Sequence, residues 1–175
     1  YPMRRKYNND KVIGMLYHDS KYKGFNEGVK AFEMAKEVCG NIKLVVFGSK
    51  KFLNEVDCKF FLAPSSSYLR EIYNSCDVFL CPSWREGFGL PSAEAMACKC
   101  ALVTTDTGGN RDYAIHEETA LVSSPKNVKA LSENLIKIIK DNDLFLRISQ
   151  NGYEHIQKFS WNNAVEKIEK VFLGT

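Results

Sequence analysis

Apolar and polar positions follow two alternating patterns along the first two thirds of the chain. Short, almost continuous apolar runs that are rich in β-branched and aromatic residues predict strands. These runs lie at 11–17, 43–47, 59–62, 78–81 and 101–105, with a last short one at 119–122. Nearly continuous apolar strands are typical of parallel sheets that helices cover on both faces.

The segments between these runs have apolar residues at helical spacing. Gly40 is expected to end the first helix, and Ser66 or Ser67 to cap the second, which runs to about residue 75. A short helix is expected to end at His116. After the last strand the pattern is helical throughout, with elements at 128–139, 144–156 and 161–172. The fold class is therefore α/β: a doubly wound, Rossmann-like parallel sheet flanked by helices, with a helical C-terminal segment.

The loop between the runs 78–81 and 101–105 has the features of a ligand site. Gly87 and Gly89 allow a tight turn and a close approach of the backbone to a ligand, and Pro91 suits the first position of a helix. A helix that begins here has free amides. These amides and the helix dipole together favour an anion.

Two carboxylates flank this expected anion site. Glu86 precedes the turn and Glu94 lies about one turn inside the helix. Because carboxylates accept hydrogen bonds from vicinal hydroxyls and repel phosphate, the pair suits a ligand with phosphate in the middle and hydroxyl-rich rings on both sides. A nucleotide sugar has this shape. The alternative is an ordinary crossover between strands, in which both glutamates are solvated.

Length and composition narrow the class of protein. The 175 residues, 45% hydrophobic and 26% charged, indicate one globular domain. The net charge of +3 is small and its lysines and arginines are dispersed, which argues against nucleic-acid binding and leaves weak attraction to an anionic membrane open. No apolar run is long enough to span a membrane and no signal peptide opens the chain, so a cytoplasmic location is expected, with peripheral contact at the inner face of the membrane as a second option.

The string Ser83-x-x-Glu86-Gly-Phe-Gly-Leu-Pro91-x-x-Glu94 resembles the signature of retaining glycosyltransferases of family four, in which two glutamates are separated by seven residues. Further blocks are similar to the same family, and all of them belong to its C-terminal half. They are Lys23-Gly24, Val46-Phe-Gly48, Leu69-x-x-Ile-Tyr-x-x-Cys-Asp77-Val-Phe-Leu-x-Pro82-Ser83, Thr105-Asp-x-Gly-Gly109 followed by Asp112-Tyr113, Leu121-Val122 and Phe159-Ser-Trp161.

The resemblance implies a two-Rossmann-domain (GT-B) architecture, of which residues 11–175 would form the nucleotide-sugar donor-binding domain. Residues 1–10 look like the end of the interdomain linker, and the N-terminal acceptor domain would be absent from this chain. The full protein would move a sugar from a nucleotide diphosphate sugar to a glycan or lipid-linked acceptor in surface polysaccharide or glycoconjugate synthesis. The isolated domain is expected to be inactive.

The resemblance also implies roles for three charged side chains. Glu94 would bind the ribose hydroxyls, Glu86 the hydroxyls of the transferred sugar, and Lys23 the diphosphate. Glu86 and Lys23 would be the catalytic residues, since stabilisation of a departing diphosphate is the core of this chemistry.

Backbone groups complete the implied donor site. Amides at Phe88, Gly89 and Leu90 would cradle sugar and phosphate, and Gly87 and Gly14 are the remaining donor-binding positions. Family members need no bound metal, so neither a metal nor a cofactor is expected beside the nucleotide-sugar substrate.

The chain departs from the family at one cation. The family usually has Gly-Arg at the end of the first strand, whereas this chain has Gly14-Met15. Arg85, His18 and Lys21 are the candidates for the second cation that would bind phosphate.

Other polar groups receive simpler interpretations. The six cysteines form no Cys-x-x-Cys pair and are predicted to be reduced. The sequence Asp141-Asn-Asp143 has the form of a metal-binding motif, but its place between two helices favours helix caps. Arg111 and Asp112 stay open between ligand contacts and a loop ion pair. His116 and His155 are interpreted as surface or packing residues on helices.

Two alternatives to a transferase remain. One is a stand-alone nucleotide-sugar-binding module. The other is a sugar-nucleotide epimerase, or a phosphorylase, of the same architecture; a catalytic histidine or a cofactor lysine would favour it.

Overall fold

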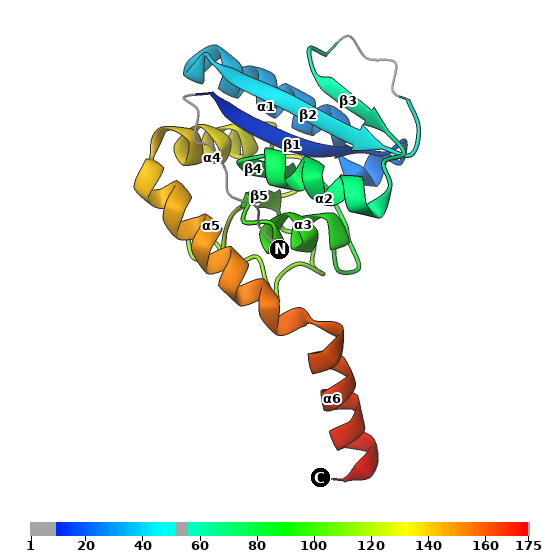
Figure 1. Ribbon diagram of the computed structural model, residues 1–175. Helices are drawn as coiled ribbons and strands as arrows, with labels where there is room; N and C mark the ends of the chain where they lie inside the picture. Colours follow the sequence, from blue (N-terminus) through cyan, green and yellow to red (C-terminus); the bar gives the residue numbers. More distant parts are fainter. Residues whose placement is uncertain (1–9, 52–55, 175) are drawn as a thin grey trace.

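The computed structural model describes residues 10–51 and 56–174 (Figure 1). Its centre is a six-stranded sheet in the order β3-β2-β1-β4-β5-β6, and every neighbouring pair is parallel. The strands are β1 (Lys11–Tyr17), β2 (Ile42–Gly48), β3 (Lys59–Leu62), β4 (Val78–Cys81), β5 (Ala101–Thr105) and β6 (Ala120–Ser123). The α/β doubly wound parallel sheet is confirmed.

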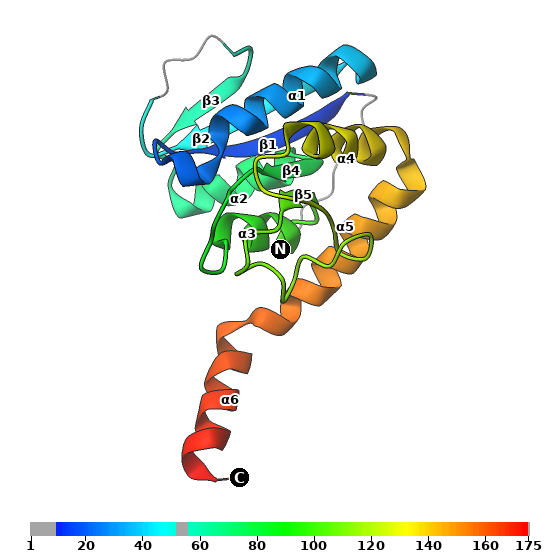
Figure 2. The same cartoon turned by 180° about the vertical axis from the view of Figure 1, so that it is seen from behind.

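Helices cover both faces of the sheet. They are α1 (Phe25–Cys39), α2 (Ser66–Ser75), α3 (Leu90–Ala97), α4 (Val128–Lys140), α5 (Asn142–Ile156) and α6 (Trp161–Leu173), with 3-10 turns η1 (Lys21–Lys23) and η2 (Gln157–Phe159). The helices α2 and α3 lie in front of the sheet in Figure 1, and α1 and α4 lie in front of it in the reverse view of Figure 2.

The core has two parts, one on each face. One unites β-strand residues with α1, α4 and the start of α5, and includes Phe32, Leu135 and Phe145. The other lies under α2 and α3 and includes Tyr73 and Met96. Because all strands run in the same direction, the loops that follow their carboxyl ends gather along one edge, where open α/β sheets bind ligands.

Two details differ from the expectations. Ser65, not Ser66 or Ser67, caps α2: its side chain accepts a hydrogen bond from the Tyr68 amide at 3.3 Å. The segment that ends at His116 forms turns in place of a helix. The side chain of Asn110 explains this, since it accepts a bond from the Thr107 amide (3.1 Å), donates to the Thr105 carbonyl (2.9 Å) and thereby fixes the turn.

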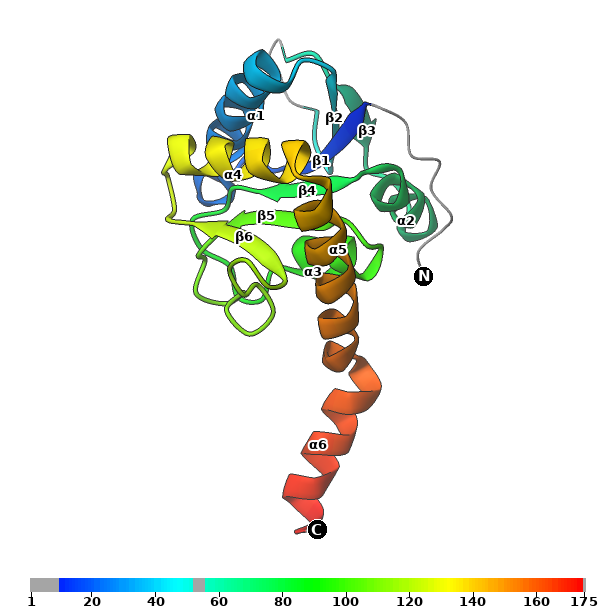
Figure 3. The ribbon, with the colours of Figure 1, turned by 90° about the vertical axis from the view of Figure 1, so that its left-hand side faces the viewer.

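The last helix extends away from the domain. Figure 3 shows α6 continuing beyond the end of α5, clear of the sheet. None of its residues is buried, and Trp161 and Phe172 are 86% and 84% exposed. The predicted helical C-terminal segment is confirmed, and its apolar face has no cover within the described residues.

Candidate functional site

The site is built around an ion pair between the loops that follow β1 and β4. The Nζ atom of Lys23 lies 2.8 Å from Oε1 and 2.9 Å from Oε2 of Glu86. The two side chains are 25% and 12% exposed, so the pair is shielded from water yet accessible from the sheet edge. These residues lie 63 positions apart in the chain, and the parallel topology brings them together.

A buried hydroxyl fixes the Glu86 carboxylate from the other side. The Oγ atom of Ser83 donates to Glu86 Oε1 at 2.8 Å, and Ser83 is 3% exposed. The Thr105 hydroxyl in turn donates to the Ser83 carbonyl, which ties the loop after β4 to the end of β5. Glu86 is thus held by a cation and by a neutral donor.

The second glycine turn supports the same loop. The Glu86 amide lies 3.5 Å from the Thr107 carbonyl, and Glu86 and Gly108 form an isolated parallel bridge. Gly109 packs directly on the loop: an added Cβ would overlap the carbonyl oxygens of Glu86 and Gly87. Only glycine permits this approach.

Helix α3 begins as the motif predicts. Its N-cap is Gly89, whose φ of 85° lies in the left-handed region, and no side chain caps the helix. The hydroxyl of buried Tyr113 donates to the carbonyls of Phe88 (2.7 Å) and Gly89 (3.2 Å). Burial raises the pKa of Tyr113, so its hydroxyl remains a donor. The first amides of α3 are therefore held in place without a side-chain cap.

Glu94 lies on the exposed side of α3, one turn beyond this start. The hydroxyl of Tyr73, on α2, donates to Glu94 Oε2 at 2.9 Å. The sequence patterns did not single out Tyr73 or Tyr113 as site residues. Both tyrosines fall within blocks that resemble the family, and this was the only signal for either of them.

The remaining predicted positions lie apart from this group. Gly14 is in the interior of β1, opposite Phe79, and a Cβ there would meet Cys76. Met15, at the position where the family usually has arginine, is 0% exposed and packs in the core against Gly28. A long charged side chain would not fit in this place.

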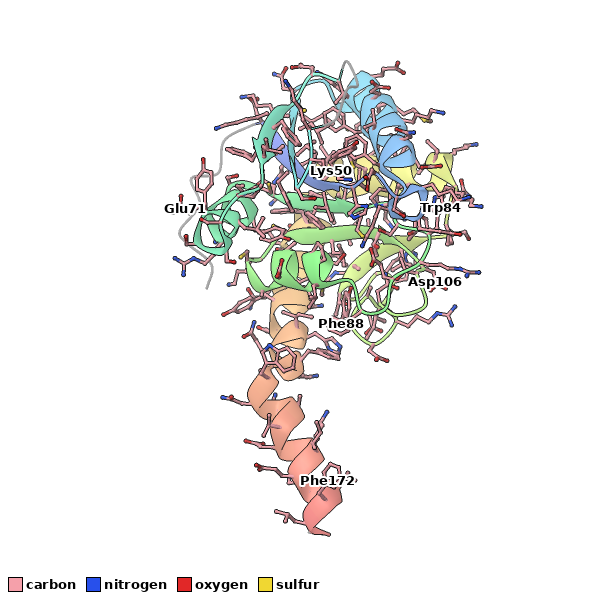
Figure 4. The ribbon with its side chains drawn as sticks, turned by 90° about the vertical axis from the view of Figure 1, so that its right-hand side faces the viewer. Lys50, Glu71, Trp84, Phe88, Asp106 and Phe172 are labelled. Carbon is pink, nitrogen blue, oxygen red and sulfur yellow. The ribbon has the colours of Figure 1, made fainter. Side chains whose placement is uncertain are left out.

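The candidate replacement cations occupy the loops on the α1 side of the edge. His18 and Lys21 line a cavity of about 390 Å³ together with Trp84, and Arg85 is exposed. Figure 4 shows Trp84 and Asp106 on the same side of the molecule. A lysine that the sequence patterns did not single out, Lys126, places its Nζ atom 4.2 Å from the centre of the Trp84 ring.

Several of the other polar positions have defined partners in the structure. Arg111 forms a two-pronged ion pair with Asp106 (2.8 Å for both bonds), and this contact lowers the pKa of the Asp106 carboxyl. Asp141 caps α5 by accepting from the Leu144 amide at 2.9 Å, as expected of a helix cap. His116 forms an isolated parallel bridge with Ala120 and is not on a helix, and its Nδ1 atom accepts from the Val122 amide.

Residues 10–51 and 56–174 contain no group of three or more His, Cys, Asp or Glu side chains that could hold a metal ion. None of the helices in this part is long and apolar enough to cross a bilayer. The six cysteines are free thiols, as predicted.

A doubly wound parallel sheet with a cation, two carboxylates and an uncapped helix start at its carboxyl edge defines a Rossmann-like ligand-binding domain. A family model described as "Glycosyl transferases group 1" matches residues 3–155, so the chain belongs to this glycosyltransferase family. The C-terminal domain of the group 1 protein LpcC from Francisella tularensis has a TM-score of 0.72 and 27% identity, with 85% of each chain covered.

Two further proteins place the chain relative to whole enzymes. The capsular polysaccharide biosynthesis glycosyltransferase CapM of Staphylococcus aureus is 31% identical over 176 residues, which cover 94% of this chain and 46% of CapM. Anabaena Alr3699/HepE, solved with UDP-glucose, has the same fold: its TM-score is 0.81 at 18% identity, over 95% of this chain and 50% of that one. The chain thus spans about half the length of these relatives.

Proposed function

We propose that this chain is the nucleotide-sugar donor-binding half of a retaining glycosyltransferase that builds a surface polysaccharide or glycoconjugate. The observation that carries the proposal is the grouping of Lys23, Glu86 and Glu94 around the uncapped start of α3. Membership of the group 1 family and the similarity to CapM support the reaction class. The acceptor is a glycan or a lipid-linked carrier.

The charges suit each part of a nucleotide diphosphate sugar. The ammonium group of Lys23 and the α3 amides bind the diphosphate, because free helix amides and the dipole attract anions. Glu94 accepts hydrogen bonds from the ribose, and Glu86 from the transferred sugar. The remaining donor contacts come from Phe88, Gly89, Leu90 and Gly87 at the same loop. Gly14, which the sequence also suggested, is buried inside β1 and is left out of the proposed contacts.

The same groups support the chemical step. The bond between the anomeric carbon and the diphosphate oxygen breaks, and a bond to the acceptor oxygen forms on the same face of the sugar. The acceptor proton passes to the departing diphosphate. Lys23 and the amides stabilise the negative charge that develops on this leaving group, which is the largest catalytic contribution in many enzymes.

The domain boundaries follow from the same proposal. Residues 1–10, of which only Asp10 lies in the described part, are the end of a linker, and residues 11–175 form the donor-binding domain. An acceptor-binding domain would account for the half of CapM that this chain does not match. The uncovered apolar face of α6 is consistent with such a partner domain, and peripheral contact of the full enzyme with the inner membrane surface would bring it to a lipid-linked acceptor.

Calorimetry tests the binding function directly. The protein is titrated with UDP, GDP and ADP and with their glucose and N-acetylglucosamine conjugates. We expect one base to be preferred and the sugar conjugate to bind more tightly than the diphosphate alone. Lack of binding to every nucleotide would overturn the proposal. Transfer activity in the protein extended by its acceptor domain would separate a transferase from a stand-alone binding module.

A further inference from the structure

The partner of Glu94 is a tyrosine whose position is fixed by the core. Tyr73 is 2% exposed, and its ring meets Phe47 and Phe79 edge-on at centroid distances of 5.3 and 5.5 Å. Its hydroxyl reaches out of this core to Glu94 Oε2, at 2.9 Å. The donor is therefore rigid, whereas the acceptor is an exposed side chain on a helix surface.

The Tyr73 hydroxyl is the donor in its bond to Glu94, because it stays protonated. Burial, followed by the adjacent Glu94 carboxylate, raises the pKa of Tyr73. The phenol therefore keeps its proton and donates a hydrogen bond to the carboxylate. Among residues 10–51 and 56–174, Tyr73 bonds to Oε2 of Glu94 and no bond to Oε1 is seen, so Oε1 and the remaining lone pairs can accept from a ligand.

An exposed glutamate without such a partner samples several rotamers, and binding a ligand through it requires that this freedom be lost. A bond made before the ligand arrives removes part of this entropic cost, as preorganisation does in other sites. The bond also directs the free carboxylate oxygen to one place beside the start of α3.

We propose that Tyr73 is a positioning residue for nucleotide recognition: it holds the Glu94 carboxylate in the orientation that accepts hydrogen bonds from the two ribose hydroxyls. This inference rests on the proposed donor-binding function. It adds a residue from α2 that does not itself touch the ligand.

The test compares Tyr73→Phe with the unchanged protein by calorimetry. The probes are UDP, GDP and ADP, each beside its 2′,3′-dideoxy counterpart. Tyr73→Phe keeps the buried ring and removes only the hydroxyl. We expect about a tenfold loss of affinity for the preferred diphosphate, because Glu94 regains its rotamer freedom. We expect no change for the dideoxy form, which has no hydroxyl for Glu94 to bind.

Two variants make the result specific. Tyr68→Phe removes a hydroxyl from the same helix at a position that is 43% exposed, and should leave both affinities unchanged. In a Glu94→Gln background, Tyr73→Phe should cause no further loss beyond that of Glu94→Gln alone, because the two act through one contact.

The outcomes separate this inference from the function on which it rests. An unchanged affinity of Tyr73→Phe, or equal losses for the diphosphate and its dideoxy form, would overturn the positioning role. If Glu94→Gln lowers affinity while Tyr73→Phe does not, the ribose contact stands and the role of Tyr73 is wrong. If Glu94→Gln has no effect, or no diphosphate binds, the proposed ribose contact itself is wrong and the inference fails with it.

Discussion

Lys23 donates to both carboxylate oxygens of Glu86, at 2.8 and 2.9 Å, so the proposed phosphate cation and the proposed sugar ligand are partners of each other. A diphosphate that binds Lys23 competes with Glu86 for the same ammonium group. The bond from Ser83 to Glu86 Oε1 does not involve Lys23, so we expect it to hold the carboxylate in place while the cation is shared. The two functions are therefore coupled, and variants of one residue should affect the other.

This coupling predicts that substitutions of Glu94 and Glu86 affect binding of the nucleoside diphosphate differently. Glu94→Gln should weaken binding of the nucleoside diphosphate, because the ribose contact is common to donor and product. Glu86→Gln should leave diphosphate binding unchanged or tighter, since Lys23 loses its competitor and a negative charge is removed. With the nucleotide sugar, Glu86→Gln should lose the extra affinity that the sugar provides. Calorimetry with both ligands measures this, and equal losses for both variants with both ligands would refute the assignment.

Removal of the cation itself should have a large effect. Lys23→Ala should cost about 1.5–3 kcal/mol of diphosphate binding, the range for a hydrogen bond to a charged group. Exposed Lys30, on α1, offers a matched Lys30→Ala control that should bind normally. If Lys23→Ala binds the diphosphate with unchanged affinity, then another cation of this edge, such as Lys21 or Arg85, binds the phosphate.

The buried hydroxyl of Ser83 should matter for the sugar more than for the nucleotide. Ser83→Ala removes one of the two donors that hold Glu86 and should lower unfolding free energy by about 1 kcal/mol. It should also reduce the affinity gained from the sugar, with little effect on the bare diphosphate. Denaturant unfolding and paired titrations check the two parts, and a uniform loss for both ligands would indicate a general distortion of the loop.

The contact between the two glycine turns gives a stability prediction. Gly109→Ala would place a methyl group against the Gly87 and Glu86 carbonyls, so the loop has to shift, at a cost of about 1–3 kcal/mol. Gly87→Ala is the matched control in the same loop, because a Cβ there meets nothing within 4 Å. Thermal unfolding should show a lower Tm for Gly109→Ala alone. Equal Tm values for both variants would mean that the turns do not pack as described.

Local patterns were sufficient for the strands, because each is a short apolar run, and the central strands β4 and β5 are buried throughout. The ranges 11–17, 59–62, 78–81 and 101–105 match the observed strands. Sequence patterns gave the wrong secondary structure or cap where a side chain bonds to the backbone. The Asn110 amide replaces the short helix expected before His116 with turns, and Ser65 takes the capping role expected of its neighbours.

In the site, too, sequence patterns predicted some features and missed others. The motif predicted which residues lie at the start of α3, but not what orients them. The bond between Tyr73 and Glu94 joins two helices, and no residue spacing encodes it. The departure from the family at Met15, by contrast, was visible in the sequence. The buried position of Met15 in the core explains why no cation occupies this position.

Glycosyl transfer should require more than residues 1–175. In a two-domain transferase the acceptor is oriented in the cleft between the domains, where closure excludes water and places the acceptor hydroxyl near the anomeric carbon. Residues 1–175 match about half of CapM, and the proposed site lies at an open sheet edge. We therefore expect the purified chain to bind a nucleotide sugar weakly and to show no transfer, with slow donor hydrolysis as its only turnover.

Adding the acceptor half should restore transfer, and α6 should contribute to the assembly. The exposed Trp161 and Phe172 present a large apolar area for a monomeric domain, and such surfaces usually mark an interface. The double variant Trp161→Ala and Phe172→Ala should weaken association of separately expressed halves while leaving nucleotide binding by residues 1–175 intact. Exposed Glu166 and Lys167 on the same helix provide control substitutions to alanine. Sedimentation measures association and a radiolabelled donor measures transfer; robust transfer by residues 1–175 alone would show that the chain contains a complete active site.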